Sequence, residues 1–314
     1  MEVHSPNRST IALAAAGALA STGTAYLGVR NLLTGQADHA RQVIPKAWET
    51  PPRADGVYTS AGGPVRWRRE MAVDLNLMVF GDSTATGYGC RSADDVPGVL
   101  LARALAEESG QRIRLSTKAI VGATSKGLSG QVDAMFVAGP PPDAAVIMIG
   151  ANDITALNAI GPSARRLGGA VRRLRASGAV VIVGTCPDFG VITAIPHPLR
   201  WVARTRGQRL ARAQTAAVRT AGGIPVPLAD LLTQEFVREP EKMFSADGYH
   251  PSAHGYALAA KQLLPALFAA LDNPTSAAAH ELAPATAAAG PVRTRLRSMT
   301  RLQRRSAPVV VPAG

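Results

Sequence analysis

Short apolar runs alternate with longer helical patterns along most of this 314-residue chain, from Leu75 to Leu271. Strands separated by helices of this length form βαβ units. The chain is therefore predicted to fold as an α/β domain with a mainly parallel sheet and helices on both faces. The strands are expected at Leu75–Phe80, Ile113–Val121, Ala144–Gly150, Ala179–Thr185 and Gly223–Ala229, and the helices at Val96–Ser109, Leu128–Val137, Ser163–Ser177, Leu199–Thr220 and about Ser252–Leu271.

Small and polar residues follow three of these strands. Ser83 comes after the first strand in Gly-Asp-Ser, Gly122 comes after the second in Val-Gly-Ala-Thr-Ser, and Asn152 comes after the third in Gly-x-Asn-Asp. Sites in sheets of this kind lie outside the carboxyl ends of the strands, so the three residues should converge on one edge. Ser83 is then a candidate nucleophile, and the other two segments fit the binding of a carbonyl oxygen that becomes negative.

A serine needs a base within hydrogen-bond reach and a third group that orients the base. The segment Phe244–His254 supplies both, because Asp247 lies three residues before His250 and Pro251 suits the first position of a helix. A carboxylate bound to one imidazole nitrogen would leave the other free to take the proton of Ser83. These residues therefore predict nucleophilic acyl transfer.

In order and local context, these four blocks resemble the SGNH (GDSL-type) hydrolase family, in an exported bacterial form. The resemblance covers roughly Leu75–Leu271 and implies a flavodoxin-like three-layer α/β/α sandwich. It also implies that Ser83, Asp247 and His250 are catalytic, that no cofactor or metal is needed, and that an oxyanion hole is formed by Ser83, Gly122 and Asn152. Gly122 departs from the family pattern, because the residues before it are apolar (Ala119, Ile120, Val121).

Other interpretations of these residues were weighed. Ser83 could cap a helix, and Ala123–Gly127 approximates a nucleophile elbow but lacks its first glycine. His250 and His254 have a zinc-ligand spacing, yet Pro251 separates them and no accompanying Glu is present. His254 is expected to be structural and His197 to lie in a surface loop or at the border of the pocket. Asp82 and Asp153 are expected to fix backbone turns.

The net charge of +12 raises the question of a nucleic-acid or membrane partner. Half of the excess positive charge lies in the segment 291–314, and no nucleic-acid-binding motif is visible in the sequence. That segment could be a disordered cationic tail or a basic helix on an anionic membrane or envelope polymer. A second arginine group, on the helix Leu199–Thr220, is expected on a solvated face. The terminal group comprises Arg293, Arg295, Arg297, Arg301, Arg304 and Arg305, and the helical group Arg200, Arg204, Arg206, Arg209 and Arg212.

The ends of the chain differ from its middle. Residues 1–30 contain an uncharged stretch, Ser9–Val29, with Ala18-Leu19-Ala20 as a possible cleavage site, which predicts export by a signal peptide or attachment by a membrane anchor. Residues 31–70 are expected to be a linker or arm, 71–272 the hydrolase domain, and 273–314 an Ala/Pro-rich and then Arg-rich tail. In an oxidising compartment, Cys90 and Cys186 could form a disulfide or remain free thiols.

Together these features predict an exported serine esterase, secreted or associated with the cell envelope, that hydrolyses short- to medium-chain carboxylic esters of small molecules or lipids. Two alternatives stay open. The same chemistry could remove or transfer acetyl groups on envelope carbohydrate, or the chain could be a non-catalytic protein that binds the envelope through its basic tail.

Overall fold

The computed structural model describes residues 27–40, 42, 50–137 and 139–273. The chain divides into two units, Met1–Glu281 and Leu282–Gly314, and every described residue belongs to the first. The leader proposed for residues 1–30 lies largely outside the described residues, and the tail 273–314 lies outside them apart from Asn273.

The described residues form one seven-stranded sheet with the order β2-β1-β4-β3-β5-β6-β7. The five consecutive strands from β4 to β7 are all parallel, and β1 pairs antiparallel with both β2 and β4. Counted from β3, the parallel strands follow the order 2-1-3-4-5, which is that of a flavodoxin-like sheet. The strands are β1 Gly56–Thr59, β2 Gly62–Val65, β3 Leu75–Gly81, β4 Ile113–Thr117, β5 Ala144–Met148, β6 Val180–Gly184 and β7 Ile224–Val226.

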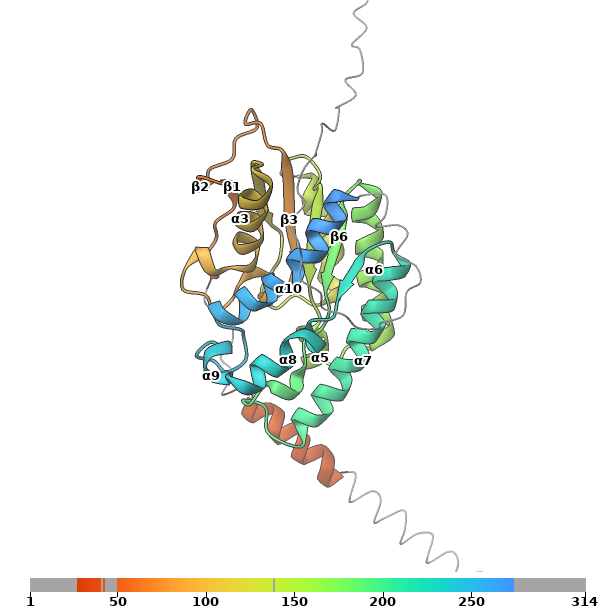
Figure 1. The fold of residues 1–314 in the computed structure, drawn as a ribbon. Helices are drawn as coiled ribbons and strands as arrows, with labels where there is room; N and C mark the ends of the chain where they lie inside the picture. The colour runs from red at the N-terminus through yellow and green to blue at the C-terminus, as the bar shows by residue number, and fades with distance from the viewer. Residues whose placement is uncertain (1–26, 41, 43–49, 138, 274–314) are drawn as a thin grey trace, which may run out of the picture. The chain divides into compact units, whose positions relative to one another are not determined.

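Helices cover both faces of the sheet, as the alternation of elements predicts. Along β3, Leu77 and Val79 join one apolar core, while Met78 and Phe80 join the other, because successive side chains point to opposite faces. The first core includes α3 (Pro97–Ser109), α8 (Leu228–Arg238) and α10 (Ala253–Asp272); the second includes α4 (Leu128–Asp133), α6 (Ile160–Ala176) and the end of α7 (Leu199–Thr220). Figure 1 shows α6 and α7 side by side, and α3 and α10 on the other face of the sheet.

Short helices follow the strands at the edge that carries the predicted site. The helix α2 (Ser83–Thr86) follows β3, and α5 (Ala151–Thr155) follows β5. Since β3 and β5 are neighbours at which the strand order reverses, the site lies at the topological switch point of the sheet.

Part of the range 31–70, expected to be a linker or an arm, has regular secondary structure. Residues 27–40 are helical, and β1 and β2 extend the sheet beyond β4. These strands are only four residues long, and β2 reads Gly-Gly-Pro-Val, so neither contains enough apolar alternation to be read as a strand.

The region after β7 also differs from the expectation. The strand predicted for Gly223–Ala229 ends at Val226, and Leu228 begins α8, which is followed by α9 (Pro240–Met243). None of the helices in the described part of the chain is both long enough and apolar enough to span a membrane.

Candidate active site

The turn from β3 into α2 presents Ser83 at the sheet edge. Gly81 has a φ of +136°, and a Cβ atom there would lie 1.8 Å from the carbonyl oxygen of Met148 on β5, so only glycine fits. Asp82 caps α2 by accepting a hydrogen bond from the Thr84 N–H (3.0 Å), and it accepts another from the Gly150 N–H (3.2 Å). As the sequence predicts, Asp82 fixes the turn, and it also ties the end of β3 to that of β5.

Ser83, His250 and Asp247 form one continuous hydrogen-bonded chain. The Ser83 Oγ lies 3.0 Å from the Nε2 of His250, and the Nδ1 of His250 lies 2.6 Å from the Oδ2 of Asp247. The side chains of His250 and Asp247 are each only 8% exposed, so little water competes for these bonds. Three residues that are 167 positions apart at their extremes are thereby placed in the geometry that a nucleophile, its base and an orienting carboxylate require.

The carboxylate of Asp247 is held in its charged form. Burial raises its pKa, but hydrogen bonds from the His250 side chain and from the backbone outweigh burial and lower the pKa to about 2. Its Oδ1 accepts from the N–H groups of Tyr249 and His250 and from the hydroxyl of Ser245, each at 2.8 Å. The ionised Asp247 accepts a hydrogen bond from the protonated Nδ1 of His250. The Nε2 of the same ring then carries no proton and can accept a hydrogen bond from the Ser83 hydroxyl.

Aromatic rings enclose the imidazole of His250. Its ring centroid lies 4.5 Å from that of Tyr88 and 5.0 Å from that of Tyr249. The hydroxyl of Tyr256, on α10, donates to the carbonyl of Tyr88 at 2.7 Å and so fixes the loop that carries Tyr88. Packing on two sides leaves the imidazole little freedom to rotate away from Ser83.

The segment after β4 and the helix after β5 contact each other beside this chain of residues. The Nδ2 of Asn152 donates to the carbonyl of Ala123 at 3.1 Å, and the Ile120 N–H donates to the carbonyl of Gly81 at 3.1 Å. The sequence suggested that the Asn152 amide is free to donate, and the structure shows that it is only partly free. The bond to Ala123 uses one of its two N–H groups and leaves the other available. Gly122 has a φ of +78° and no atom within 4 Å of the position of a Cβ.

Asp153 also connects these two segments, through hydrogen bonds from the loop after β4. It is 2% exposed and accepts hydrogen bonds from the Ser125 N–H (2.8 Å), the Ser125 hydroxyl (2.8 Å), the Ser163 hydroxyl (2.7 Å) and the Asn158 amide (3.0 Å). The prediction that Asp153 fixes the backbone is confirmed. It connects α5 with the loop after β4 and with α6, and thereby sets the position of its neighbour Asn152.

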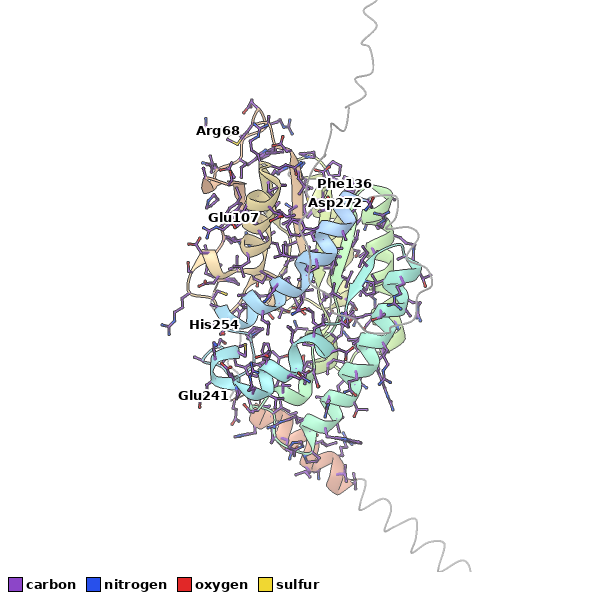
Figure 2. The ribbon with its side chains drawn as sticks, viewed as in Figure 1. Arg68, Glu107, Phe136, Glu241, His254 and Asp272 are labelled. Atoms are coloured by element: carbon purple, nitrogen blue, oxygen red, sulfur yellow. The ribbon has the colours of Figure 1, made fainter. Side chains whose placement is uncertain are left out.

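Two further histidines singled out from the sequence are exposed. His254 is exposed on α10, where Figure 2 labels it, and His197 is exposed in the loop before α7. No group of three or more metal-ligating side chains that could hold a metal ion occurs among the described residues.

Of the α7 arginines, Arg204, Arg209 and Arg212 are exposed, as expected, but some members of the group also contact neighbouring loops. Arg204 pairs with the buried Asp188 at 3.4 Å, Arg206 donates to the carbonyl of Asn158 at 3.0 Å, and Arg200 donates to the carbonyls of Ile195 and Thr193. These three guanidinium groups fasten α7 to the loops beside the site rather than forming a purely solvated face.

Sequence reasoning missed several residues that support the site. Tyr88 and Tyr249 flank His250, Ser245 binds Asp247, and Gln131 binds the backbone of Gly81. Tyr249 and Ser245 stand within two residues of Asp247, so their proximity was readable. Tyr88 and Gln131 carry no local signal, because both act on segments that are distant in sequence.

This fold and this arrangement of side chains define a known class of serine hydrolase. The chain belongs to the GDSL-like Lipase/Acylhydrolase family, whose model matches residues 79–258. It is 70% identical over 312 residues to the GDSL-like esterase Rv1075c of Mycobacterium tuberculosis. This similarity covers 98% of this chain and 99% of that protein.

Two solved structures share the fold. The crystal structure of TesA is 24% identical with a TM-score of 0.50, and the similarity covers 61% of this chain and 97% of TesA. The psychrotrophic esterase EstA from Pseudoalteromonas sp. is 18% identical with a TM-score of 0.50, and the similarity covers 64% of this chain and all of EstA (100%). At these identities the likeness concerns the fold alone.

Proposed function

We propose that this protein is a serine esterase that hydrolyses carboxylic esters through an acyl-enzyme on Ser83. The observation that carries the proposal is the hydrogen-bonded chain from Ser83 through His250 to Asp247, with bonds of 3.0 and 2.6 Å. Membership of the GDSL-like family and 70% identity to a protein named as an esterase support it.

The reaction has two stages. In the first, the Nε2 of His250 takes the proton of Ser83 while Oγ attacks the ester carbonyl, and the protonated imidazole then gives that proton to the departing alcohol. In the second, His250 takes a proton from water as the water attacks the acyl-enzyme, and the acid is released as the proton returns to Ser83. Asp247 stabilises the imidazolium that forms in each stage.

The carbonyl oxygen becomes negative in both tetrahedral intermediates and needs donors aimed at it. We assign this role to the N–H groups of Ser83 and Gly122 and to the side-chain amide of Asn152. The bond from Asn152 to Ala123 and the bonds that Asp153 accepts from Ser125 support the assignment, since they tie the helix that carries Asn152 to the loop that carries Gly122 before substrate arrives. Donors fixed in advance need no reorganisation as charge develops.

The test of this function is Ser83→Ala, assayed with p-nitrophenyl acetate and a fluorophosphonate probe. Turnover should fall by about 10³-fold or more and labelling should be lost, while the far-UV circular dichroism spectrum stays unchanged. Ser129→Ala, at an exposed position on α4, is the matched control and should keep full activity. Turnover by Ser83→Ala within tenfold of the wild type would contradict the proposal.

We also propose that the protein is exported, either secreted or attached to the cell envelope. The uncharged stretch Ser9–Val29 and the Ala18-Leu19-Ala20 sequence support export. N-terminal sequencing of the protein recovered from culture medium and from membranes tests this. A new N-terminus close to Ala20 indicates cleavage, an intact Met1 in the membrane fraction indicates an anchor, and an intact Met1 in the cytoplasmic fraction contradicts export.

The arginine-rich segment from Arg293 to Arg305 is proposed to contact an anionic membrane or envelope polymer. It contains six arginines and no acidic residue, and electrostatic attraction of this kind adds about 1 kcal/mol per basic residue near an anionic surface. The chain ending at Asn273 should lose co-sedimentation with phosphatidylglycerol vesicles that the full chain shows. Equal sedimentation of both chains would contradict the proposal.

A further inference from the structure

A cavity of about 90 Å³ adjoins the catalytic residues on the face of the sheet that α8 and α10 cover. Ser83 and His250 border it, and so do Met148 at the end of β5 and Gly184 at the end of β6. Gly184 lets the wall approach closely, because a Cβ there would lie 2.6 Å from Leu228 on α8. The cavity therefore runs from the nucleophile to the apolar core between the sheet and the two helices.

The walls of the cavity are almost entirely hydrocarbon. Leu228, Leu232 and Phe236 line it from α8, and Tyr256 and Ala259 line it from α10. Two of the polar side chains that border it have partners in the protein: the Thr233 hydroxyl donates to the carbonyl of Ala229 at 2.6 Å, and Asp188 accepts from the Gly190 N–H at 2.8 Å and pairs with Arg204. Such a wall favours a hydrocarbon group and offers little to a sugar or a charged group.

Of the two halves of an ester, the acyl half suits this cavity. The alcohol must leave to solvent after the first stage and be replaced by water, which requires an open path. The acyl group stays bonded to the Ser83 Oγ through both stages and needs a place that holds it. Gly122 and Asn152 do not line the cavity, so a carbonyl oxygen can face them while the chain extends the other way.

The size of the cavity sets a limit on the chain. An apolar cavity of ~150 Å³ binds benzene, so one of 90 Å³ accommodates about four carbon atoms. We propose that this cavity is the acyl-binding pocket and that Leu232 on α8 and Ala259 on α10 restrict the acyl chain to about four carbon atoms. The inference rests on the proposed esterase function and adds its acyl specificity.

The first test enlarges the pocket. kcat/KM is measured for p-nitrophenyl acetate, butyrate, hexanoate, octanoate and decanoate. The wild type should act best on acetate and butyrate, and Leu232→Ala should raise the octanoate-to-butyrate ratio by about tenfold, because it removes most of a side chain that lines the pocket and so enlarges it. Leu231→Ala is the matched control, since Leu231 is 42% exposed on the same helix and should leave the ratio unchanged.

The second test narrows the pocket. It tests the assignment of the acyl-binding pocket even if Leu232→Ala does not fold. Ala259→Val should lower kcat/KM for butyrate relative to acetate by about tenfold, whereas Ala257→Val, at an exposed position of α10, should not. A milder Leu232→Val variant gives a further folded comparison. Thermal melting shows that each variant is folded before its chain-length profile is used.

The outcomes separate this inference from the proposed function. If the wild type hydrolyses no ester and Ser83 is not labelled by the fluorophosphonate, the esterase function itself is wrong. If the wild type is active but hydrolyses decanoate as well as butyrate, or if folded Leu232 and Ala259 variants keep the wild-type chain-length profile, the acyl pocket lies elsewhere and the inference is overturned.

Discussion

A single carboxylate, that of Asp247, organises the turn that carries His250. It accepts four hydrogen bonds, two from backbone N–H groups, one from Ser245 and one from the imidazole of His250. Burial alone would raise its pKa, yet these donors lower the pKa to about 2, so hydrogen bonding outweighs desolvation. The same bonds that keep the carboxylate charged also fix the backbone on which His250 stands.

Asp247→Asn should lower kcat by about 10³- to 10⁴-fold, because an amide can donate to Nδ1 and favour the wrong imidazole tautomer. KM should change little, since Asp247 does not border the cavity beside Ser83. Steady-state kinetics with p-nitrophenyl butyrate check this. Asp230→Asn, at an exposed position of α8, is the control, and a kcat for Asp247→Asn within tenfold of the wild type would show that Asp247 is not the orienting group.

The lowered pKa of Asp247 also predicts how stability depends on pH. The folded state holds the carboxylate at a pKa of about 2, against 3.8 for the unperturbed group, so its stabilising contribution is complete above about pH 5 and is lost as the pH falls through 3.8 towards 2. Urea unfolding of the wild type and of Asp247→Asn between pH 2 and 5 measures it. The difference between their free energies of unfolding should shrink as the pH falls; a constant difference would contradict this.

At the scale of elements, α4 fixes the end of β3 through one side chain. Gln131 is 2% exposed, and its amide accepts from the Gly81 N–H and donates to the Gly81 carbonyl, each at 2.8 Å. Gly81 stands two residues before Ser83, so these paired bonds hold the strand end that carries the nucleophile. Gln131 is thus a positioning residue that acts through the backbone.

Gln131→Met should destabilise the protein by about 1–3 kcal/mol, because it leaves the buried N–H of Gly81 without a partner, while the Gly81 carbonyl keeps its bond from the Ile120 N–H. It should also lower kcat more than it raises KM, since the alignment of Ser83 with His250 is disturbed while the cavity is untouched. Urea unfolding and steady-state kinetics measure the two effects. Gln234→Met, exposed on α8, is the control, and a kcat that falls only in proportion to the folded fraction would show a purely structural role.

The elements that sequence predicts well are those with strong local patterns. The helix at Leu199–Thr220 begins and ends as predicted, the buried strands β5 and β6 lie within the predicted runs, and β3 extends one residue beyond its run. By contrast, β1 and β2 are short; β1 joins the sheet by pairing with β4, and β2 pairs with β1, which no local pattern reveals. The site follows the same rule: Ser83, Asp247 and His250 stand in readable motifs, whereas Tyr88 and Gln131 depend on contacts made only in the folded chain.

At the scale of the whole molecule, the reactivity of the two cysteines indicates whether the apolar core is closed. Both are buried in the same apolar core, and both are free thiols rather than a disulfide, which answers the alternative that the sequence left open. Burial, reinforced by the nearby Asp95, raises the pKa of Cys90 to about 12, and burial likewise raises the pKa of Cys186. Since the thiolate is the reactive form, neither thiol should react while the chain stays folded.

Labelling with Ellman's reagent at pH 8 tests this state of the thiols. A shift in the pKa of Cys90 from 9.0 to about 12 lowers its thiolate fraction by about 10³-fold, so labelling should be slow in buffer and fast in 6 M guanidinium, where two thiols are counted. Cys90→Ser should reduce that count to one. If the slow labelling follows the rate of unfolding, both thiols become accessible only when the core opens as a unit. If the unfolded chain, without reductant, shows no reactive thiol, then Cys90 and Cys186 form a disulfide. That result would contradict the free thiols of the structure.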